Sequence, residues 1–156
     1  MTTDITRPHA KNLRRGRYSQ SGYYYLITAV AYNRLPYFTS LACARAVIKA
    51  MHSADVAGCC ETEAWVLMPD HLHWLFVLRE SDISGLIARM KQTSSSKINR
   101  LTGQCGQPIW QRGYHDHALR QEENVAGIGR YIVANPLRAG LVDHIGDYPY
   151  WDAVWL

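Results

Sequence analysis

The sequence predicts a single α+β domain in which helices pack on a four-stranded antiparallel sheet. Three observations lead to this class. The chain has 156 residues, enough for one domain with a sizeable apolar core. Apolar, β-branched runs typical of strands alternate along it with segments of helical periodicity. Their order, β-α-β-β-α-β-α, most simply gives an antiparallel sheet covered on one face.

The first half of the predicted domain consists of a strand, a helix and a hairpin. Residues 22–32 are rich in aromatic and β-branched side chains, which is typical of a strand. Residues 40–53 carry an apolar stripe at helical spacing after a Thr-Ser cap. Residues 62–68 and 71–78 are two apolar runs joined by a Pro-Asp connection, which predicts a hairpin.

The second half adds a helix, a strand and a final helix. Ser81 or Asp82 is expected to cap a helix that runs to about Leu101, although three serines in its second half weaken it. Residues 114–120 predict a fourth strand, and residues 122–135 a third helix. The resulting order is the ferredoxin-like (RRM-like) arrangement that RNA-recognition modules also use.

The two ends of the chain differ in character. Residues 1–20 are polar and basic and indicate a flexible arm, which leaves residues 21–156 as the domain. There is no secretory h-region and no apolar run near the ~20 residues that span a bilayer, so a cytoplasmic protein without a membrane partner is expected. The aromatic C-terminal segment GDYPYWDAVWL is expected to pack on the domain; a partner surface or a plug over the active site are the alternatives.

Basic side chains are concentrated in two blocks. Residues 1–20 carry five basic side chains and one acidic one, and residues 86–120 carry six and one, whereas the remaining stretches are net negative. Such blocks favour contact with a polyanion, most commonly nucleic acid, although a solvated surface has the same composition. The candidate contacts are Lys11, Arg14, Arg15, Arg17, Arg89, Lys91, Lys97, Arg100, Arg112 and Arg120.

Two histidines interrupt the apolar strand HLHWLFVL. Because strand side chains alternate, His71 and His73 project to one face. The other face is expected to supply core packing through Met68, Leu72, Trp74 and Phe76. Two neutral imidazoles side by side are half a shell for a divalent metal, although many such pairs bind none. Asp70 is expected to face away, and the pair His115 and His117 competes for the same role.

The third predicted helix carries a tyrosine and an asparagine outside its apolar stripe. Tyr131 and Asn135 are four residues apart and therefore lie on one helical face. The amide oxygen of Asn135 could complete a metal shell and place the phenol of Tyr131 nearby. Pro136 disfavours helical geometry at Asn135, so an end or a kink is expected there. An amphipathic aromatic at a helix–sheet boundary is the alternative reading of Tyr131.

Four stretches, in chain order, carry a family signature: GYYYLITAVAYNRLPYF, VLMPDHLHWLF, IWQRGYHDHALR and YIVANPLRAGLV. With the linking helix they span roughly residues 14–150. The pattern resembles the REP-associated tyrosine transposases, a group within the single-tyrosine HUH transposase superfamily. His71-Leu72-His73 matches the family's His-hydrophobe-His motif, Tyr131 its nucleophile and Asn135 its third metal ligand.

The resemblance also selects between the two histidine pairs. It implies that His71 and His73 bind the metal, and it leaves Asp116 and His117 as residues that orient the ligands or contact DNA. A purely structural role is the alternative for both. With two imidazoles, one amide oxygen and no carboxylate, the implied shell fits Mg²⁺ or Mn²⁺, and zinc is not excluded by ligand type.

The implied activity is metal-dependent cleavage and rejoining of single-stranded DNA through a 5′-phosphotyrosine intermediate. The implied substrates are short palindromic REP repeats that fold into hairpins, and a monomer is expected, with a homodimer as the alternative. Two other functions fit the residues. One is a nucleic-acid-binding regulator of the same fold that does not cut DNA. The other is a metal phosphodiesterase in which water attacks in place of tyrosine.

Overall fold

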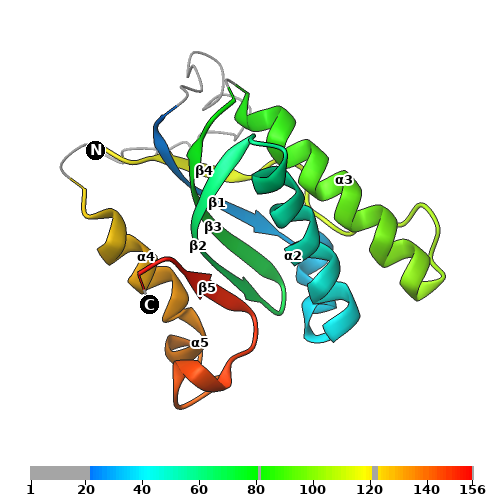
Figure 1. Cartoon of the computed structure of the whole chain (residues 1–156). Coiled ribbons are helices and arrows are strands. Elements are labelled where there is room, and N and C mark those ends of the chain that lie inside the picture. Colours follow the sequence, from blue (N-terminus) through cyan, green and yellow to red (C-terminus); the bar gives the residue numbers. More distant parts are fainter. Residues whose placement is uncertain (1–21, 81, 121–122, 156) are drawn as a thin grey trace, which may run out of the picture.

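The computed structural model describes residues 22–80, 82–120 and 123–155, which form one antiparallel sheet with helices on both faces (Figure 1). The predicted arm over residues 1–20 lies outside these described residues. The strands are β1 (Tyr24–Val30), β2 (Cys60–Met68), β3 (His71–Leu78), β4 (His115–Ala118) and β5 (Trp151–Ala153). They lie in the order β4-β1-β3-β2-β5, and every neighbouring pair is antiparallel.

Helices cover both faces of this sheet, so the predicted cover on one face alone is wrong. The α-helices are α2 (Leu41–Val56), α3 (Ile83–Thr102), α4 (Val125–Val133) and α5 (Asn135–Arg138). Three short 3-10 helices are η1 (Tyr32–Arg34), η2 (Tyr37–Thr39) and η3 (Ile145–Asp147). Helices α2 and α3 lie side by side on one face, and α4 packs on the opposite one (Figure 1). We call these the α2/α3 face and the α4 face.

The second helical layer forms because α4 has an apolar stripe of its own. Ile132 of this helix is buried in a cluster with Val66 of β2 and Leu75 of β3. Burial removes this apolar surface from water, which stabilises the packed arrangement. The α4 face is therefore defined by a core distinct from the one beneath α2 and α3.

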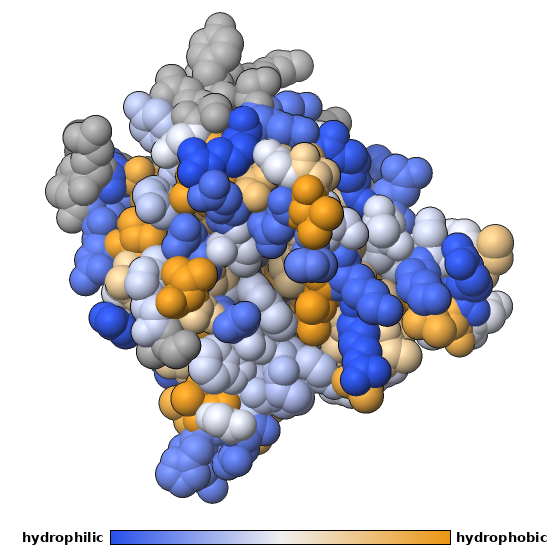
Figure 2. All heavy atoms as spheres, viewed as in Figure 1, coloured by the Kyte–Doolittle hydropathy of each residue, from blue (hydrophilic) through white to orange (hydrophobic). Residues whose placement is uncertain are grey.

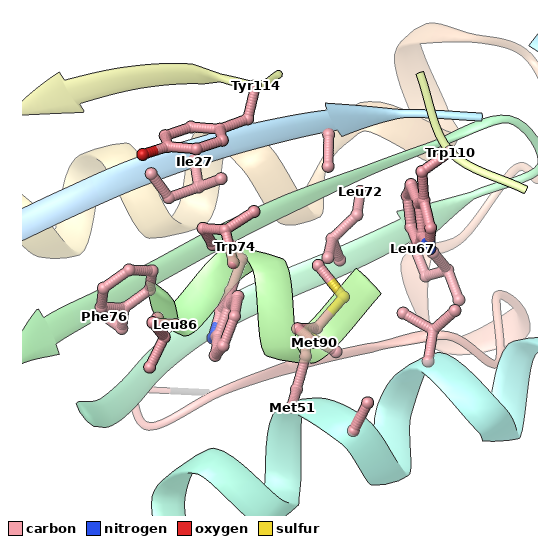
Figure 3. Packing of buried hydrophobic residues seen from close by; sticks show 14 of the residues in the cluster. Ile27, Met51, Leu67, Leu72, Trp74, Phe76, Leu86, Met90, Trp110 and Tyr114 are labelled. Atoms are coloured by element: carbon pink, nitrogen blue, oxygen red, sulfur yellow. The ribbon is translucent and has the colours of Figure 1, made fainter. Parts of the chain in front are cut away.

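The larger core lies between the sheet and helices α2 and α3 (Figure 3). Trp74 and Phe76 of β3 are in contact, with ring centroids 4.7 Å apart and ring planes tilted by 54°. Met51 of α2 and Leu86 and Met90 of α3 complete this cluster. The predicted core face of β3 is thus confirmed, and His71 and His73, which alternate with it, project to the α4 face.

Met68 is the exception to the predicted core face. It lies on the α4 face with Leu75, because β2 and β3 are antiparallel and Met68 stands directly opposite His71. Residues paired in this way share a face of the sheet. The prediction assigned Met68 to the same face as Leu72, although the Pro-Asp turn places the two residues on different strands.

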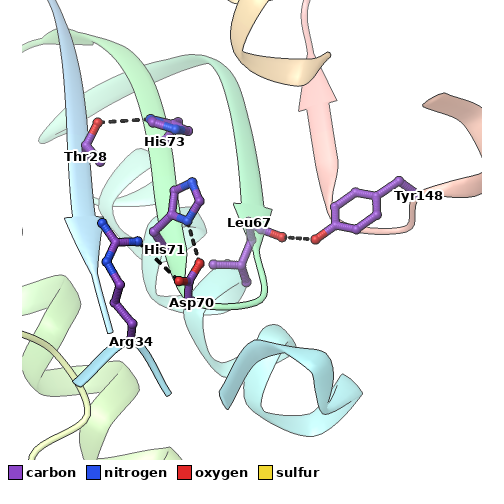
Figure 4. Close-up of polar contacts among 7 residues, drawn as sticks. All are labelled: Thr28, Arg34, Leu67, Asp70, His71, His73 and Tyr148. Atoms are coloured by element: carbon purple, nitrogen blue, oxygen red, sulfur yellow. Dashed lines mark hydrogen bonds and ion pairs between the residues drawn. The ribbon is translucent and has the colours of Figure 1, made fainter. Parts of the chain in front are cut away.

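The C-terminal segment supplies a fifth strand, where the sequence predicted four. Strand β5 pairs with β2 at Ala64, Trp65 and Val66. The phenol of Tyr148, just before β5, donates a hydrogen bond to the backbone carbonyl of Leu67 (Figure 4). Packing of this segment on the domain is therefore confirmed.

The helix predicted over residues 122–135 is shorter in the structure, where it is α4, and the separate short helix α5 follows it. The side chain of Asn124 caps the beginning of α4 by accepting the N–H of Gly127 at 2.9 Å. At the other end Pro136 has no N–H to donate to the carbonyl four residues earlier, so the hydrogen bonds of α4 cannot continue through it. Helix α4 accordingly stops at Val133 and α5 begins two residues later.

The serines that were expected to weaken α3 are accommodated within it. Ser94 is fully buried, and its hydroxyl donates to the carbonyl of Met90 at 2.8 Å and accepts the indole N–H of Trp110 at 3.0 Å. Ser94→Ala is expected to lower the free energy of unfolding by about 1–3 kcal/mol, because the buried N–H of Trp110 loses its acceptor. Ser96→Ala, at an exposed site of α3, should change it by less than ~0.5 kcal/mol. Chemical denaturation would measure both, and equal effects would contradict this account.

The exposed surface seen from the side of Figure 1 is mainly hydrophilic, with small separate apolar groups (Figure 2). Within the described ranges, no helix is both long and apolar enough to cross a membrane.

Candidate active site

The two histidines of β3 lie edge to face on the α4 face, with ring centroids 4.9 Å apart. In each ring Nδ1 already has a partner (Figure 4). The Nδ1 of His73 lies 2.9 Å from the hydroxyl of Thr28, and that of His71 lies 2.7 Å from the carboxylate of Asp70. Such contacts fix the ring orientation and leave Nε2 as the nitrogen that can bind a ligand.

Asp70 contacts His71, although the sequence predicted that it would face away. Strand alternation does not apply to it, because it lies in the turn between β2 and β3. Its carboxylate also accepts a hydrogen bond from Arg34 at 3.2 Å. Partial burial alone would raise the pKa of Asp70, but the hydrogen bonds and charges of His71 and Arg34 hold it below its ordinary value. An ionised Asp70 can therefore accept the Nδ1–H of His71.

The environment of His73 favours an uncharged imidazole. Burial, together with the charges of the neighbouring His71 and Arg138, lowers the pKa of His73 to about 4. At neutral pH the ring therefore carries one proton. If this proton is on Nδ1, it is donated to Thr28, and Nε2 presents a lone pair. This is the form of histidine that binds metal ions.

Tyr131 lies on the helix that covers the same face of the sheet. Its neighbours in sequence, Ile132 and Val133, are buried in the cluster that contains Leu75 of β3. Tyr131 itself is 64% exposed, so it is not part of the core, as its spacing predicted. Its phenol is accessible from solvent on the side of the sheet that carries the two histidines.

Arg138 connects the residues that the sequence singled out. It donates a hydrogen bond to Oδ1 of Asn135 at 2.6 Å, and its Cζ lies 3.8 Å from the centroid of the Tyr131 ring. Its charge also lowers the pKa of His73. Arg138 was not among the site residues predicted from the sequence. The signal was present, because Tyr131, Asn135 and Arg138 follow the i, i+4, i+7 spacing of one helical face.

A second phenol, that of Tyr148, lies near the same face but has a structural role in the fold. Burial, together with the neighbouring Tyr150, raises the pKa of Tyr148 to about 12. Its hydroxyl donates to the carbonyl of Leu67. A protonated, bonded phenol is poorly suited to attack a substrate, whereas Tyr131 is exposed.

An open groove of about 500 Å³ runs beside Tyr131, lined by Leu26, His117, Glu123, Asn124, Gly127, Ile128 and Tyr131. His117 belongs to the α4 face, and its Nε2 lies 2.9 Å from the carboxylate of Glu123. Asp116 stands opposite Ile27, which is buried on the α2/α3 face, so its side chain points away from His71 and His73. Of these two residues, only His117 lies beside the predicted nucleophile.

The predicted basic contacts do not gather around the histidines. Four lie on α3, on the opposite side of the sheet: Arg89, Lys91, Lys97 and Arg100. Arg89 is paired with Glu80 at 2.7 Å. Arg112 and Arg120 precede and follow β4 in the sequence, and both are exposed. The remaining four are outside the described residues: Lys11, Arg14, Arg15 and Arg17. Contact with DNA stays a prediction for all ten residues. Because α3 and the histidines lie on opposite faces of the sheet, DNA bound at the histidines would contact α3 only if it extended around the edge of the sheet.

The donor set for a metal is limited to imidazole and amide groups. Among the described residues, no group of three or more His, Cys, Asp or Glu side chains could hold a metal ion. The Nδ1 contacts of His71 and His73 leave the Nε2 atoms as the available donors, and imidazole nitrogen is a common ligand of divalent cations. The predicted third ligand, the Oδ1 of Asn135, is bonded to Arg138 in this structure.

Comparison with known proteins assigns the chain to a family. It matches the model of IS200-like transposases over residues 19–135. A REP-associated tyrosine transposase of Escherichia coli is 31% identical over 91 residues, which are 58% of this chain and 52% of the relative. A Haemophilus influenzae protein assigned to the same group is 32% identical over 101 residues, 58% of this chain and 57% of that protein. The chain thus spans about half the length of the curated relatives that it matches.

The fold points to the same group. The solved structure of a REP-associated tyrosine transposase bound to a REP hairpin has a TM-score of 0.67 and 25% identity, and the match covers 86% of this chain and 79% of that one. The family model covers most of the sheet, both histidines of β3 and Tyr131. We conclude that this chain is a member of the IS200-like transposase family and is similar to its REP-associated tyrosine transposases.

Proposed function

We propose that the protein cleaves and rejoins single-stranded DNA beside hairpins, with Tyr131 as the nucleophile. The observation that carries this proposal is an exposed phenol on the helix that covers the face bearing His71 and His73. A regulator that only bound DNA would have no need for this combination. The family assignment supports DNA processing by the chain.

The proposed step is a transesterification. The Oη of Tyr131 forms a bond to phosphorus, and the bond from phosphorus to the 3′ oxygen breaks. The phenol loses its proton, and the leaving oxygen gains one. The product is a 5′-phosphotyrosine and a DNA strand with a free 3′-hydroxyl. Because one phosphodiester replaces another, a 3′-hydroxyl can reverse the reaction and rejoin a strand without ATP.

The chain's own residues supply orientation and charge for this step. A free phenol ionises near pH ~10, so it needs help at neutral pH. Thr28 and Asp70 fix the orientation of the two imidazoles. The imidazoles, together with Asn135, would hold Mg²⁺ or Mn²⁺. When bound, such a cation offsets negative charge on the phosphate in the transition state.

The proposed substrate is a hairpin with a single-stranded flank. A structural relative is described as bound to a REP hairpin. In this chain, the groove beside Tyr131 is open and lined mainly by apolar groups and by His117 and Glu123. An unpaired nucleotide next to the cleaved phosphate is a suitable occupant of such a groove, because base–aromatic stacking and a few polar contacts can hold it.

The test is an end-labelled hairpin oligonucleotide incubated with the protein and Mn²⁺. If Tyr131 attacks as proposed, an adduct that survives SDS retains the 3′ label, and the released 5′-labelled strand is extended by a polymerase. Chelation with EDTA should abolish both products. A cut strand with a 5′-phosphate and no adduct would instead indicate attack by water. Tight binding with intact DNA would indicate a regulator.

A further inference from the structure

Arg138 is hydrogen-bonded to the atom that the proposed function needs as a metal ligand. Its guanidinium donates to Oδ1 of Asn135 at 2.6 Å, a short charge-assisted bond. Arginine does not lose its proton in proteins, so pH does not release this contact. The amide oxygen has a second lone pair, but an ion bound to it would lie beside the positive guanidinium, and the like charges repel each other. An ion at the histidines therefore gains the amide oxygen more readily once Arg138 has moved away.

The same guanidinium covers the predicted nucleophile. Its Cζ lies 3.8 Å from the centroid of the Tyr131 ring, within the range of a cation–π contact. Both Arg138 and Tyr131 are exposed, so water and DNA can reach this contact. The side chain of Arg138 therefore restrains both the amide of Asn135 and the phenol ring. Because it is exposed, it can leave both of them for a stronger partner.

A phosphate group is such a partner. The planar fork of arginine matches two phosphate oxygens, and these carry a full negative charge, whereas the amide oxygen carries only a partial one. A phosphate placed for attack by Tyr131 must come close to the Tyr131 ring, over which Arg138 already lies. The guanidinium can therefore reach it by a small movement of its own side chain.

We propose that Arg138 is an exchange residue that holds Asn135 and Tyr131 in the free protein and moves to the attacked phosphate when DNA binds. This inference rests on the proposed function. The exchange releases the Oδ1 of Asn135 at the moment when the substrate arrives. It therefore couples completion of the metal shell to the presence of DNA, and it makes Arg138 a phosphate-binding residue.

The proposal gives Arg138→Ala opposite effects on two measurements. Without DNA, the variant should bind Mn²⁺ more tightly than the unmodified protein, because Oδ1 of Asn135 is released and a positive charge near His73 is removed. With a hairpin substrate at saturating Mn²⁺, the variant should form the adduct more slowly, because the phosphate loses its guanidinium. A residue with only a structural role would not give these opposite signs.

The first measurement is Mn²⁺ binding to the DNA-free protein, followed by electron paramagnetic resonance of free Mn²⁺. Arg138→Ala should lower the dissociation constant about three- to tenfold, a modest factor because the contact is exposed. The second is the rate of adduct formation with the labelled hairpin, which should fall about 100-fold. Arg138→Lys should form the adduct faster than Arg138→Ala but more slowly than the unmodified protein, because lysine keeps the positive charge but lacks the planar guanidinium that binds two phosphate oxygens.

Two further variants isolate the cause. Arg130→Ala removes the same charge from an exposed site on α4 and should leave both measurements within about twofold of the unmodified protein. In an Asn135→Ala background, Arg138→Ala should produce a smaller gain in Mn²⁺ affinity, because no amide oxygen is left to release. An undiminished gain there would overturn the exchange and leave a charge effect alone.

The outcomes separate this inference from the proposed function. If the unmodified protein forms the adduct but Arg138→Ala alters neither measurement, the exchange is wrong and the proposed function stands. Weaker Mn²⁺ binding by Arg138→Ala would also overturn the exchange. If the unmodified protein forms no adduct with Mn²⁺, the proposed function falls, and the phosphate-binding role of Arg138 falls with it.

Discussion

Tyr131→Phe is expected to abolish the covalent adduct while hairpin binding stays within about twofold of the unmodified protein. The change removes only the hydroxyl oxygen that would attack phosphorus, so the adduct should fall at least ~1,000-fold. The ring is kept, and with it the surface on which Arg138 stacks. Because Tyr131 is 64% exposed, the fold should be unaffected. Gel mobility shift would measure binding, and SDS gels with 3′-labelled DNA would measure the adduct.

The matched control is Tyr23→Phe, which removes the same atom from another exposed tyrosine at the far end of the sheet from His71. It should form the adduct at the rate of the unmodified protein. An adduct of undiminished yield in Tyr131→Phe would remove the basis of the proposed function. Loss of hairpin binding together with the adduct would show instead that the hydroxyl acts in recognition.

The sequence predicted strands β1 to β4 and helices α2 and α3 because their apolar periodicity reflects burial on one side. It did not predict β5, because Trp151–Ala153 is only three residues long and pairs at an edge that no local pattern reveals. The second helical layer was missed for a related reason. The apolar stripe of α4 predicts that the helix packs on something, but not on which face of the sheet it packs.

The candidate site shows the same division between local and tertiary information. Strand alternation placed His71 and His73 on one face, and helical spacing placed Tyr131 off the core; both predictions are confirmed. Thr28 was not predicted, because its contact with His73 joins residues 45 positions apart. Asp70 was assigned to the wrong side because the alternation of a strand was extended into a turn.

The contact between Thr28 and His73 leads to the second large effect. His73→Ala removes one of the two imidazoles proposed to hold the cation, and adduct formation is expected to fall about 1,000-fold at any Mn²⁺ concentration. Thr28→Val keeps the shape of the side chain but leaves Nδ1 of His73 without its partner. Loss of such an orienting contact typically costs about 10- to 100-fold in metal affinity.

The two variants should therefore differ in how they respond to metal. At limiting Mn²⁺, Thr28→Val should form the adduct about 10- to 100-fold more slowly than the unmodified protein, and excess Mn²⁺ should restore most of the rate. Excess Mn²⁺ should not rescue His73→Ala. Thr93→Val, at an exposed site of α3 on the opposite side of the sheet, is the matched control and should respond like the unmodified protein. If Thr28→Val also behaves normally at limiting Mn²⁺, Thr28 does not orient a metal ligand. If His73→Ala remains active, the imidazole pair does not hold the cation, and the catalytic role of the histidine face must be abandoned.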